Sequence, residues 1–101
     1  MNYHLNVERA ARRSFIEKNI GYGEPVATTF FISKTSKKER INVLSDTGII
    51  TIYTKDWKPV TIYIANFSEA CKIYEKAHGS AVPRYLVEKF RTAQQYKEFE
   101  P

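Results

Sequence analysis

The sequence of 101 residues has few of the residue types that define several large classes of protein. It contains one cysteine, two histidines, four glycines and four prolines. The lone Cys71 cannot form an internal disulfide, which argues against a disulfide-stapled secreted domain and favours a reducing compartment. No apolar run approaches the roughly 20 residues that a membrane span requires, and polar residues interrupt the segment where a signal peptide would lie. We therefore expect a cytoplasmic protein with no membrane partner.

With so few histidine, cysteine and glycine residues, the sequence lacks the common metal-binding and catalytic motifs. His4, Cys71 and His78 are far apart in the sequence, and no Cys-x-x-Cys or His-x-x-x-His spacing occurs, so we expect no metal site. Gly21 and Gly23 lack the spacing of a dinucleotide-binding or phosphate-binding loop, so we expect no cofactor. No Gly-x-Ser-x-Gly motif indicates a serine nucleophile. We interpret Cys71 as a small core residue.

The residues that are present describe one folded domain with a positive charge. Hydrophobic residues make up 43% of the chain and aromatic residues 14%, which is typical of a globular domain, and we assign residues 1–101 to a single one. Sixteen Lys and Arg residues outnumber eleven Asp and Glu residues, giving a net charge of +5. This charge favours an anionic partner such as nucleic acid or an acidic protein, although many small domains are basic for solubility alone.

Helical signals lie at both ends of the chain. Asn6 is a suitable N-cap for a helix from Val7 to about Asn19, with Val7, Ala11 and Phe15 as its buried stripe. After the strands, Asn66 and Glu69 have the form of a capping box for a helix that ends at Gly79. The last helix is predicted over residues 83–98, because Pro83 suits a first helical turn.

Between these helices the pattern predicts four strands. The first spans residues 26–33, and the stretch from Arg40 to Ala65 holds three more, joined by hairpins at Asp46-Thr47 and over residues 55–59. The predicted fold class is α+β, with an N-terminal helix, a four-stranded antiparallel sheet and two C-terminal helices packed on one face.

A two-residue loop at Asp46-Thr47 predicts a register in which Val43 lies opposite Ile50, and Arg40 opposite Tyr53. In the second hairpin, the same alternation places Tyr53 opposite Thr61. This register gives an apolar face made of Ile41, Val43, Ile50, Ile52, Val60, Ile62 and Ile64. It gives a polar face made of Arg40, Asn42, Thr51, Tyr53, Thr61 and Tyr63. The polar face becomes a candidate site if the C-terminal helices pack on the isoleucines.

These side chains suit metal-independent cleavage of RNA. The 2′-hydroxyl can attack its own phosphate if groups exchange protons and cations stabilise the added charge, and arginine binds two phosphate oxygens at once. The candidate catalytic residues are Arg40, Tyr53, Thr61, Tyr63, His4 and Arg9. The candidate nucleic-acid-binding residues are Arg12, Arg13, Lys34, Lys37, Lys38, Asn42 and Thr51. The alternative is structural: cross-strand pairs in the sheet, with the charges on a solvated helix face and a solvated loop.

A helix with the spacing His4-x4-Arg9-x2-Arg12-Arg13, followed by an antiparallel sheet ending in Val60-Thr61-Ile62-Tyr63, resembles the small RelE-type ribonuclease toxins. It is also similar to phage and plasmid proteins of the wider barnase–colicin–RelE-like fold. The resemblance covers roughly residues 4–65 and implies metal-independent RNA cleavage, often with an antitoxin bound over the site. It implies roles for His4 and Arg9 on the helix, and for Thr61 and Tyr63 on the last strand. The chain departs from that pattern because two helices follow the sheet and because His4 precedes the predicted helix cap.

The competing interpretation is a non-enzymatic interaction module, such as a phage or mobile-element accessory factor that binds nucleic acid or a host protein. The C-terminal helices favour it, because that end carries more aromatic residues than a small core needs, namely Tyr85, Phe90, Tyr96 and Phe99. Our leading hypothesis is a small cytoplasmic protein that interacts with nucleic acid, RNA in particular. We favour binding without cleavage over a ribonuclease toxin.

Overall fold

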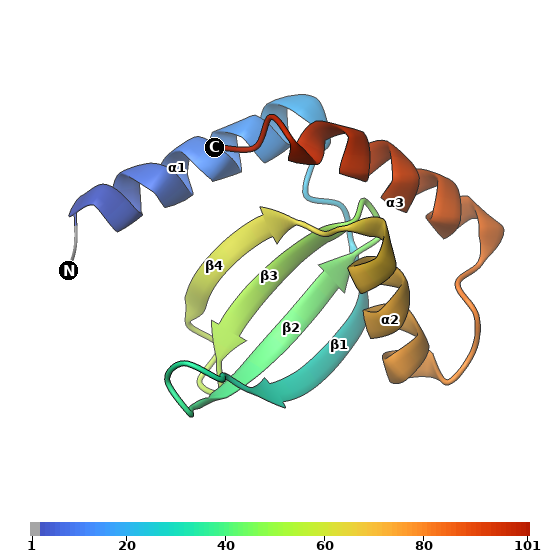
Figure 1. Cartoon of the computed structure of the whole chain (residues 1–101), viewed down its shortest axis with the longest axis horizontal. Helices are drawn as coiled ribbons and strands as arrows, with labels where there is room; N and C mark the ends of the chain where they lie inside the picture. Colours follow the sequence, from blue (N-terminus) through green and yellow to red (C-terminus); the bar gives the residue numbers. More distant parts are fainter. Residues whose placement is uncertain (1–2) are drawn as a thin grey trace.

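The computed structural model describes the backbone of residues 3–101 and the side chains from residue 8 onward. The elements in chain order are α1 (Tyr3–Asn19), β1 (Pro25–Ile32), β2 (Glu39–Ser45), β3 (Ile49–Thr54), β4 (Pro59–Ile64), α2 (Phe67–His78) and α3 (Arg84–Lys97). The predicted α+β fold is therefore confirmed: an N-terminal helix, a four-stranded antiparallel sheet and two C-terminal helices (Figure 1). Within the part of the chain that the structure describes, none of the helices combines the length and apolar character of a membrane span.

The four strands lie in the sheet in sequence order, each antiparallel to the next. The helices α1 and α3 gather at one end of the sheet, and α2 lies beside β1 (Figure 1). The opposite end consists of the β1–β2 loop over residues 33–38 and the β3–β4 loop over residues 55–58, and we call it the hairpin end. No helix is drawn across the hairpin end, so the strands reach solvent there (Figure 1).

The predicted β2–β3 register is wrong by one residue. Val43 lies opposite Thr51, and Arg40 lies opposite Thr54 instead of Tyr53. The cause is the loop, which has three residues instead of two: the Gly48 N–H donates to the Ser45 carbonyl at 3.1 Å, and Gly48 has a φ of 81°. A turn followed by a left-handed residue is a common three-residue hairpin connection, and glycine adopts that conformation without steric cost.

The predicted β3–β4 register is wrong in the same way. Ile52 lies opposite Thr61, while Tyr53 lies opposite Pro59 across a register shift. Here the Trp57 N–H donates to the Thr54 carbonyl at 2.9 Å, and Trp57 takes the left-handed position with a φ of 63°. A single-residue change of register moves side chains to the other face of a sheet, so both predicted faces have to be reassigned.

The two faces of the sheet each mix polar and apolar residues, and each faces a different helix. Partners across antiparallel strands share a face and alternate residues change face. The α2 face carries Ala27, Thr29, Arg40, Asn42, Leu44, Ile50, Ile52, Thr61 and Tyr63. The α1 face carries Thr28, Phe30, Ile32, Ile41, Val43, Ile49, Thr51, Tyr53, Ile62 and Ile64. The predicted single apolar face is therefore wrong, and so is the predicted continuous polar row.

The core consists of one buried cluster on each face. On the α2 face, Leu44 and Ile50 pack with Ile73 of α2 and with Leu86 and Phe90 of α3. Both C-terminal helices therefore contribute to the core on the α2 face, and α2 packs on that face as predicted. Cys71 is half-buried against the same cluster, as expected of a small core residue, and burial raises the pKa of its thiol.

On the α1 face, the fully buried Ile16 of α1 packs with Ile49, Ile62 and Ile64. Ala93 from α3 joins this second cluster, so α3 contributes to the core on both faces. Each buried isoleucine of this cluster stabilises the fold by about 1.5–3 kcal/mol relative to exposure. The α1 cluster lies at the helix end of the sheet and leaves the remainder of the α1 face uncovered.

Three predicted helix details need correction. Helix α1 begins at Tyr3, so Asn6 lies inside the helix and cannot cap it, and the backbone of His4 is helical. Ala11 is exposed and Ile16 is buried instead, because the helix turns a different face to the sheet. The side chains of His4 and Val7 lie outside the described residues, so their predicted roles are not addressed by the structure.

The caps of the C-terminal helices were predicted in part. Gly79 ends α2 in the left-handed conformation, as predicted, and Asn66 occupies the N-cap position of α2. The predicted capping box is wrong, because the Asn66 side chain makes no cap hydrogen bond and Glu69 accepts a hydrogen bond from the Tyr63 hydroxyl. Pro83 is the N-cap of α3 instead of its first helical residue.

Candidate nucleic-acid interface

The structure does not assemble the predicted catalytic row. Arg40 and Thr61 lie on the α2 face of the sheet, whereas Tyr53 and Thr51 lie on the α1 face. Two side chains on opposite faces cannot act on one phosphate, because the sheet separates them. The predicted residues have to be judged by the surfaces on which they are found.

The Arg12 side chain forms hydrogen bonds and an ion pair within the fold, at the outer edge of β4. Its Nη1 donates to Thr61 Oγ1 at 3.3 Å and to the Ile62 carbonyl at 3.2 Å. Its Nε lies 3.8 Å from the Glu100 carboxylate, and the Arg12 side chain is 25% exposed. Arg12 and Thr61 therefore fasten α1 to the sheet and are poorly placed to bind a ligand.

The same edge is closed further along by the C-terminal segment. The Ile64 N–H donates to the Glu100 carboxylate, and the Lys97 ammonium donates to the Ile64 carbonyl. Each contact satisfies a backbone group that an edge strand would otherwise present to solvent or to another strand. The outer edge of β4 is thus capped by charged side chains.

Tyr63 and Asn42 are also built into the structure of the α2 face. The Tyr63 hydroxyl donates to Glu69 at 3.1 Å, and Lys97 lies 5.3 Å from the centre of its ring. Burial, together with the Glu69 carboxylate, raises the pKa of Tyr63, so this phenol holds its proton at neutral pH. Asn42 Oδ1 is buried and has no hydrogen-bond partner among the described residues, so it faces the interior rather than a ligand.

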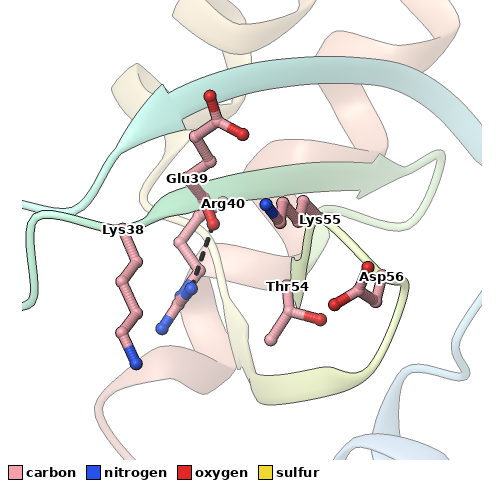
Figure 2. Close-up of a pocket in the computed structure, with 6 residues that line it drawn as sticks. All are labelled: Lys38, Glu39, Arg40, Thr54, Lys55 and Asp56. Atoms are coloured by element: carbon pink, nitrogen blue, oxygen red, sulfur yellow. Dashed lines mark hydrogen bonds between the residues drawn. The ribbon is translucent and has the colours of Figure 1, made fainter.

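Arg40 lies at the hairpin end, beside an open depression of about 530 Å³. Lys38, Glu39, Arg40, Thr54, Lys55 and Asp56 line it (Figure 2). Lys38 and Arg40 extend to the same side of β2, while the Glu39 carboxylate points the other way (Figure 2). Among the described residues, the hydrogen-bond acceptor found for Arg40 Nη1 is the Glu39 carbonyl, at 3.0 Å.

Two acidic residues, Glu39 and Asp56, also line this depression, but its three cations form no ion pair in the described part of the chain. The ion pairs found there join Arg12 and Lys97 to Glu100, Arg84 to Glu88, and Lys89 to Asp46. Lys38, Arg40 and Lys55 take part in none of them. The exposed Lys34 and Lys37 lie in the adjoining β1–β2 loop, so positive charge is concentrated at this end of the sheet.

A second group of predicted residues meets in a groove between α1 and the uncovered part of the α1 face. Arg13, Thr51 and Tyr53 line this α1 groove together with Tyr22 and Val43. Arg9 lines an adjoining depression that also includes Arg13. Sequence reasoning missed Tyr22, whose hydroxyl donates to the Arg13 carbonyl at 3.2 Å.

The most exposed apolar side chains of the sheet were also missed. Phe30, Ile32 and Trp57 are 69%, 64% and 56% exposed. All three line a depression next to Ile41, and the Trp57 ring lies 5.5 Å from that of Tyr53. The aromatic residues were visible in the sequence, but their common surface depends on the register that the loops impose.

Comparison of the chain with protein-family models, with curated proteins and with solved structures found no match. The resemblance to RelE-type toxins therefore stays a prediction. It depends in part on Thr61 and Tyr63. The Thr61 hydroxyl accepts a hydrogen bond from Arg12, and the Tyr63 hydroxyl donates one to Glu69.

Proposed function

We propose that this protein binds nucleic acid, RNA in particular, through phosphate contacts at the hairpin end of the sheet. The observation that carries the proposal is the set of three cations, Lys38, Arg40 and Lys55, around one open depression. They outnumber the two acidic residues that also line it, Glu39 and Asp56, and they form no ion pair among the described residues. An excess of cations that form no ion pairs attracts a polyanion, and an arginine fork matches the geometry of phosphate oxygens. The net charge of +5 adds long-range attraction.

We propose binding without cleavage. The tyrosine and threonine to which the resemblance assigns roles on the last strand, Tyr63 and Thr61, have their hydroxyls engaged within the fold. A group that is to exchange a proton with a substrate has to reach it within hydrogen-bond distance. Incubation of the protein with labelled RNA in EDTA is expected to leave the RNA intact, and metal-independent cleavage would restore the ribonuclease interpretation.

The binding proposal is tested by measuring the affinity for fluorescently labelled RNA over a range of salt concentrations. A triple variant, Lys38→Ala/Arg40→Ala/Lys55→Ala, removes the proposed contacts. Each phosphate contact to a single strand contributes about 0.7 to the slope of log affinity against log salt, so the triple variant should lower the slope by about 2.

A matched control removes the same charge elsewhere. Lys18, Lys72 and Lys76 are exposed on α1 and α2, and none of them forms an ion pair among the described residues. The control triple variant to alanine should change the slope much less. Equal losses in the two variants would mean that only net charge matters. Absent or salt-independent binding would instead favour a protein partner, such as an antitoxin or a host factor.

A further inference from the structure

Aromatic and aliphatic side chains gather on the α1 face at the hairpin end. Phe30 lies opposite Ile41 on β2, and Ile41 lies opposite Tyr53 on β3, so these three side chains make a row across the sheet. Phe30 is exposed and Tyr53 half-buried, and the buried Ile41 lies between them. Trp57 extends the row from the β3–β4 loop, with its ring 5.5 Å from that of Tyr53. We call Phe30, Ile32, Tyr53 and Trp57 the aromatic platform.

Trp57 occupies a backbone conformation that does not suit it. A φ of 63° is the left-handed region, which glycine and asparagine occupy readily and which costs other residues about 1–2 kcal/mol. The same residue leaves 56% of its surface exposed, so the strain is not offset by full burial. Strain of this kind, combined with an exposed aromatic ring, is typical of binding sites.

The charges around the platform identify the kind of molecule that would cover it. The loop around Trp57 holds Lys55 and Lys58 with one acidic residue, Asp56. Arg40 and Lys55 line the depression that holds Phe30 and Trp57, together with one acidic residue, Glu39, so cations are in excess in both places. Lysine is depleted in protein–protein interfaces. Aromatic rings bordered by cations are instead the combination that binds single-stranded nucleic acid, in which bases stack and phosphates meet the charges.

The aromatic platform continues into the α1 groove. Tyr53 belongs both to the platform and to the α1 groove, which leads past Thr51 to Tyr22 and Arg13. A single strand of RNA whose bases stack on Trp57 can therefore extend along the groove towards Tyr22 and Arg13. Duplex bases are already stacked on each other and cannot use such a surface.

We propose that the aromatic platform stacks unpaired bases, so that single-stranded RNA is the class of ligand. This inference rests on the proposed function, because it assumes that phosphates bind at the same end of the sheet. Phosphate contacts alone do not distinguish single-stranded from double-stranded RNA. With base stacking, unpaired RNA should bind at least 10-fold more tightly than a duplex of equal length.

Trp57 is the only tryptophan of the chain, so intrinsic fluorescence reports directly on the platform. Titration with an unstructured oligoribonucleotide should change the Trp57 emission, and the duplex should change it much less at the same concentration. Affinities of the variants are measured by anisotropy of labelled RNA. Trp57→Phe should stay within a few-fold of the wild-type affinity, because it keeps a ring on which a base can stack.

Trp57→Gly is the decisive variant. It should weaken binding of unpaired RNA by about 5-fold to 100-fold, which is the loss of one stacked base. Because glycine relieves the left-handed strain, the variant should stay folded with a melting temperature close to or above the wild-type value. Tyr85→Ala is the matched control, since Tyr85 is 61% exposed but lies on α3.

The outcomes separate the two proposals. If RNA binding is steeply salt-dependent but is equal for duplex and single strand, and Trp57→Gly behaves like Tyr85→Ala, the platform proposal is overturned and phosphate binding stands. If neither RNA form binds, both proposals fail. Selective loss of single-strand binding in Trp57→Gly, with binding retained in Trp57→Phe, supports base stacking.

Discussion

Arg12 and Arg13 are neighbours in sequence with the same charge, yet the structure assigns them opposite roles. The Arg12 guanidinium bonds Thr61 and Ile62 at 3.3 and 3.2 Å and approaches Glu100, whose side chain is only 10% exposed. Arg13 is exposed and lines the α1 groove. Replacing each by alanine in turn should therefore separate stability from binding.

The expected magnitude for Arg12→Ala follows from these contacts. A hydrogen bond to a charged group contributes about 1.5–3 kcal/mol, but these bonds are long and the side chain is partly exposed, so we expect a total loss of about 2 kcal/mol in the free energy of unfolding. For a domain of this size that corresponds to a fall of about 8–16 °C in melting temperature. Arg13→Ala should change stability by less than about 0.5 kcal/mol.

The measurements are urea unfolding followed by circular dichroism and RNA affinity followed by anisotropy. Arg13→Ala should weaken RNA binding and Arg12→Ala should not, at temperatures where both variants are folded. The Arg12→Lys variant keeps the charge but lacks the fork, so its stability should fall between alanine and wild type. Equal stability losses for Arg12→Ala and Arg13→Ala would refute the structural role of Arg12.

Two further predictions concern the turn and the α2 face. A Cβ at Gly48 would lie 3.1 Å from the Ala93 Cβ, whereas one at Gly79 meets nothing within 4 Å. Gly48→Ala should therefore reduce the free energy of unfolding in urea by about 2–4 kcal/mol, and Gly79→Ala by about 1–2 kcal/mol, the cost of the left-handed conformation alone. Equal costs would show that α3 does not pack against the turn. Burial raises the pKa of Tyr63, so as the pH rises the phenol loses its proton in the unfolded chain before it does so in the folded one. The contribution of Tyr63 to the free energy of unfolding is therefore complete below about pH 10 and declines above it. Tyr63→Phe should reduce the decline measured between pH 9.5 and 11.5, and an unchanged pH dependence would contradict this assignment.

The order of elements could be predicted from the sequence because each element carries its own local signal. Gly79 marks a helix end, and the stretch from Arg40 to Ala65 is rich in β-branched residues between two turn signals. These features depend on residues that are close in the chain. Local backbone preference is sufficient to place them, which is why the bounds of most elements differ from expectation by only one residue.

The register could not be predicted because it depends on whether each hairpin loop has two or three residues. Asp46-Thr47-Gly48 suits either loop, and nothing in the sequence indicates that Trp57 would adopt a positive φ. One signal was present: Ile49 and Ile50 are adjacent, and both are fully buried. Adjacent buried residues on a strand mean that both faces of the sheet are covered, which argues against a single apolar face.

The functional surfaces were predicted only as far as they depend on composition. The lysine-rich loop and Arg40 do lie at one end of the sheet, as their positions next to a hairpin suggest. The separation of Arg12 from Arg13 depends on which face of α1 meets β4, and the predicted stripe through Ala11 was wrong. The aromatic platform depends on the register and on Trp57, so it could be recognised only in three dimensions.

The capped edge of β4 has a consequence for how the sheet can associate with other chains. A further strand arriving at β4 would have to displace Arg12, Lys97 and Glu100 before it could form a ladder. Strand addition is therefore directed to the part of β1 near the hairpin end, where Phe30 and Ile32 are exposed. At its other end α2 lies beside β1, and the His78 ring hydrogen-bonds the Val26 carbonyl. If bases occupy that surface, bound RNA would also hinder the pairing of β1 with a strand of another molecule.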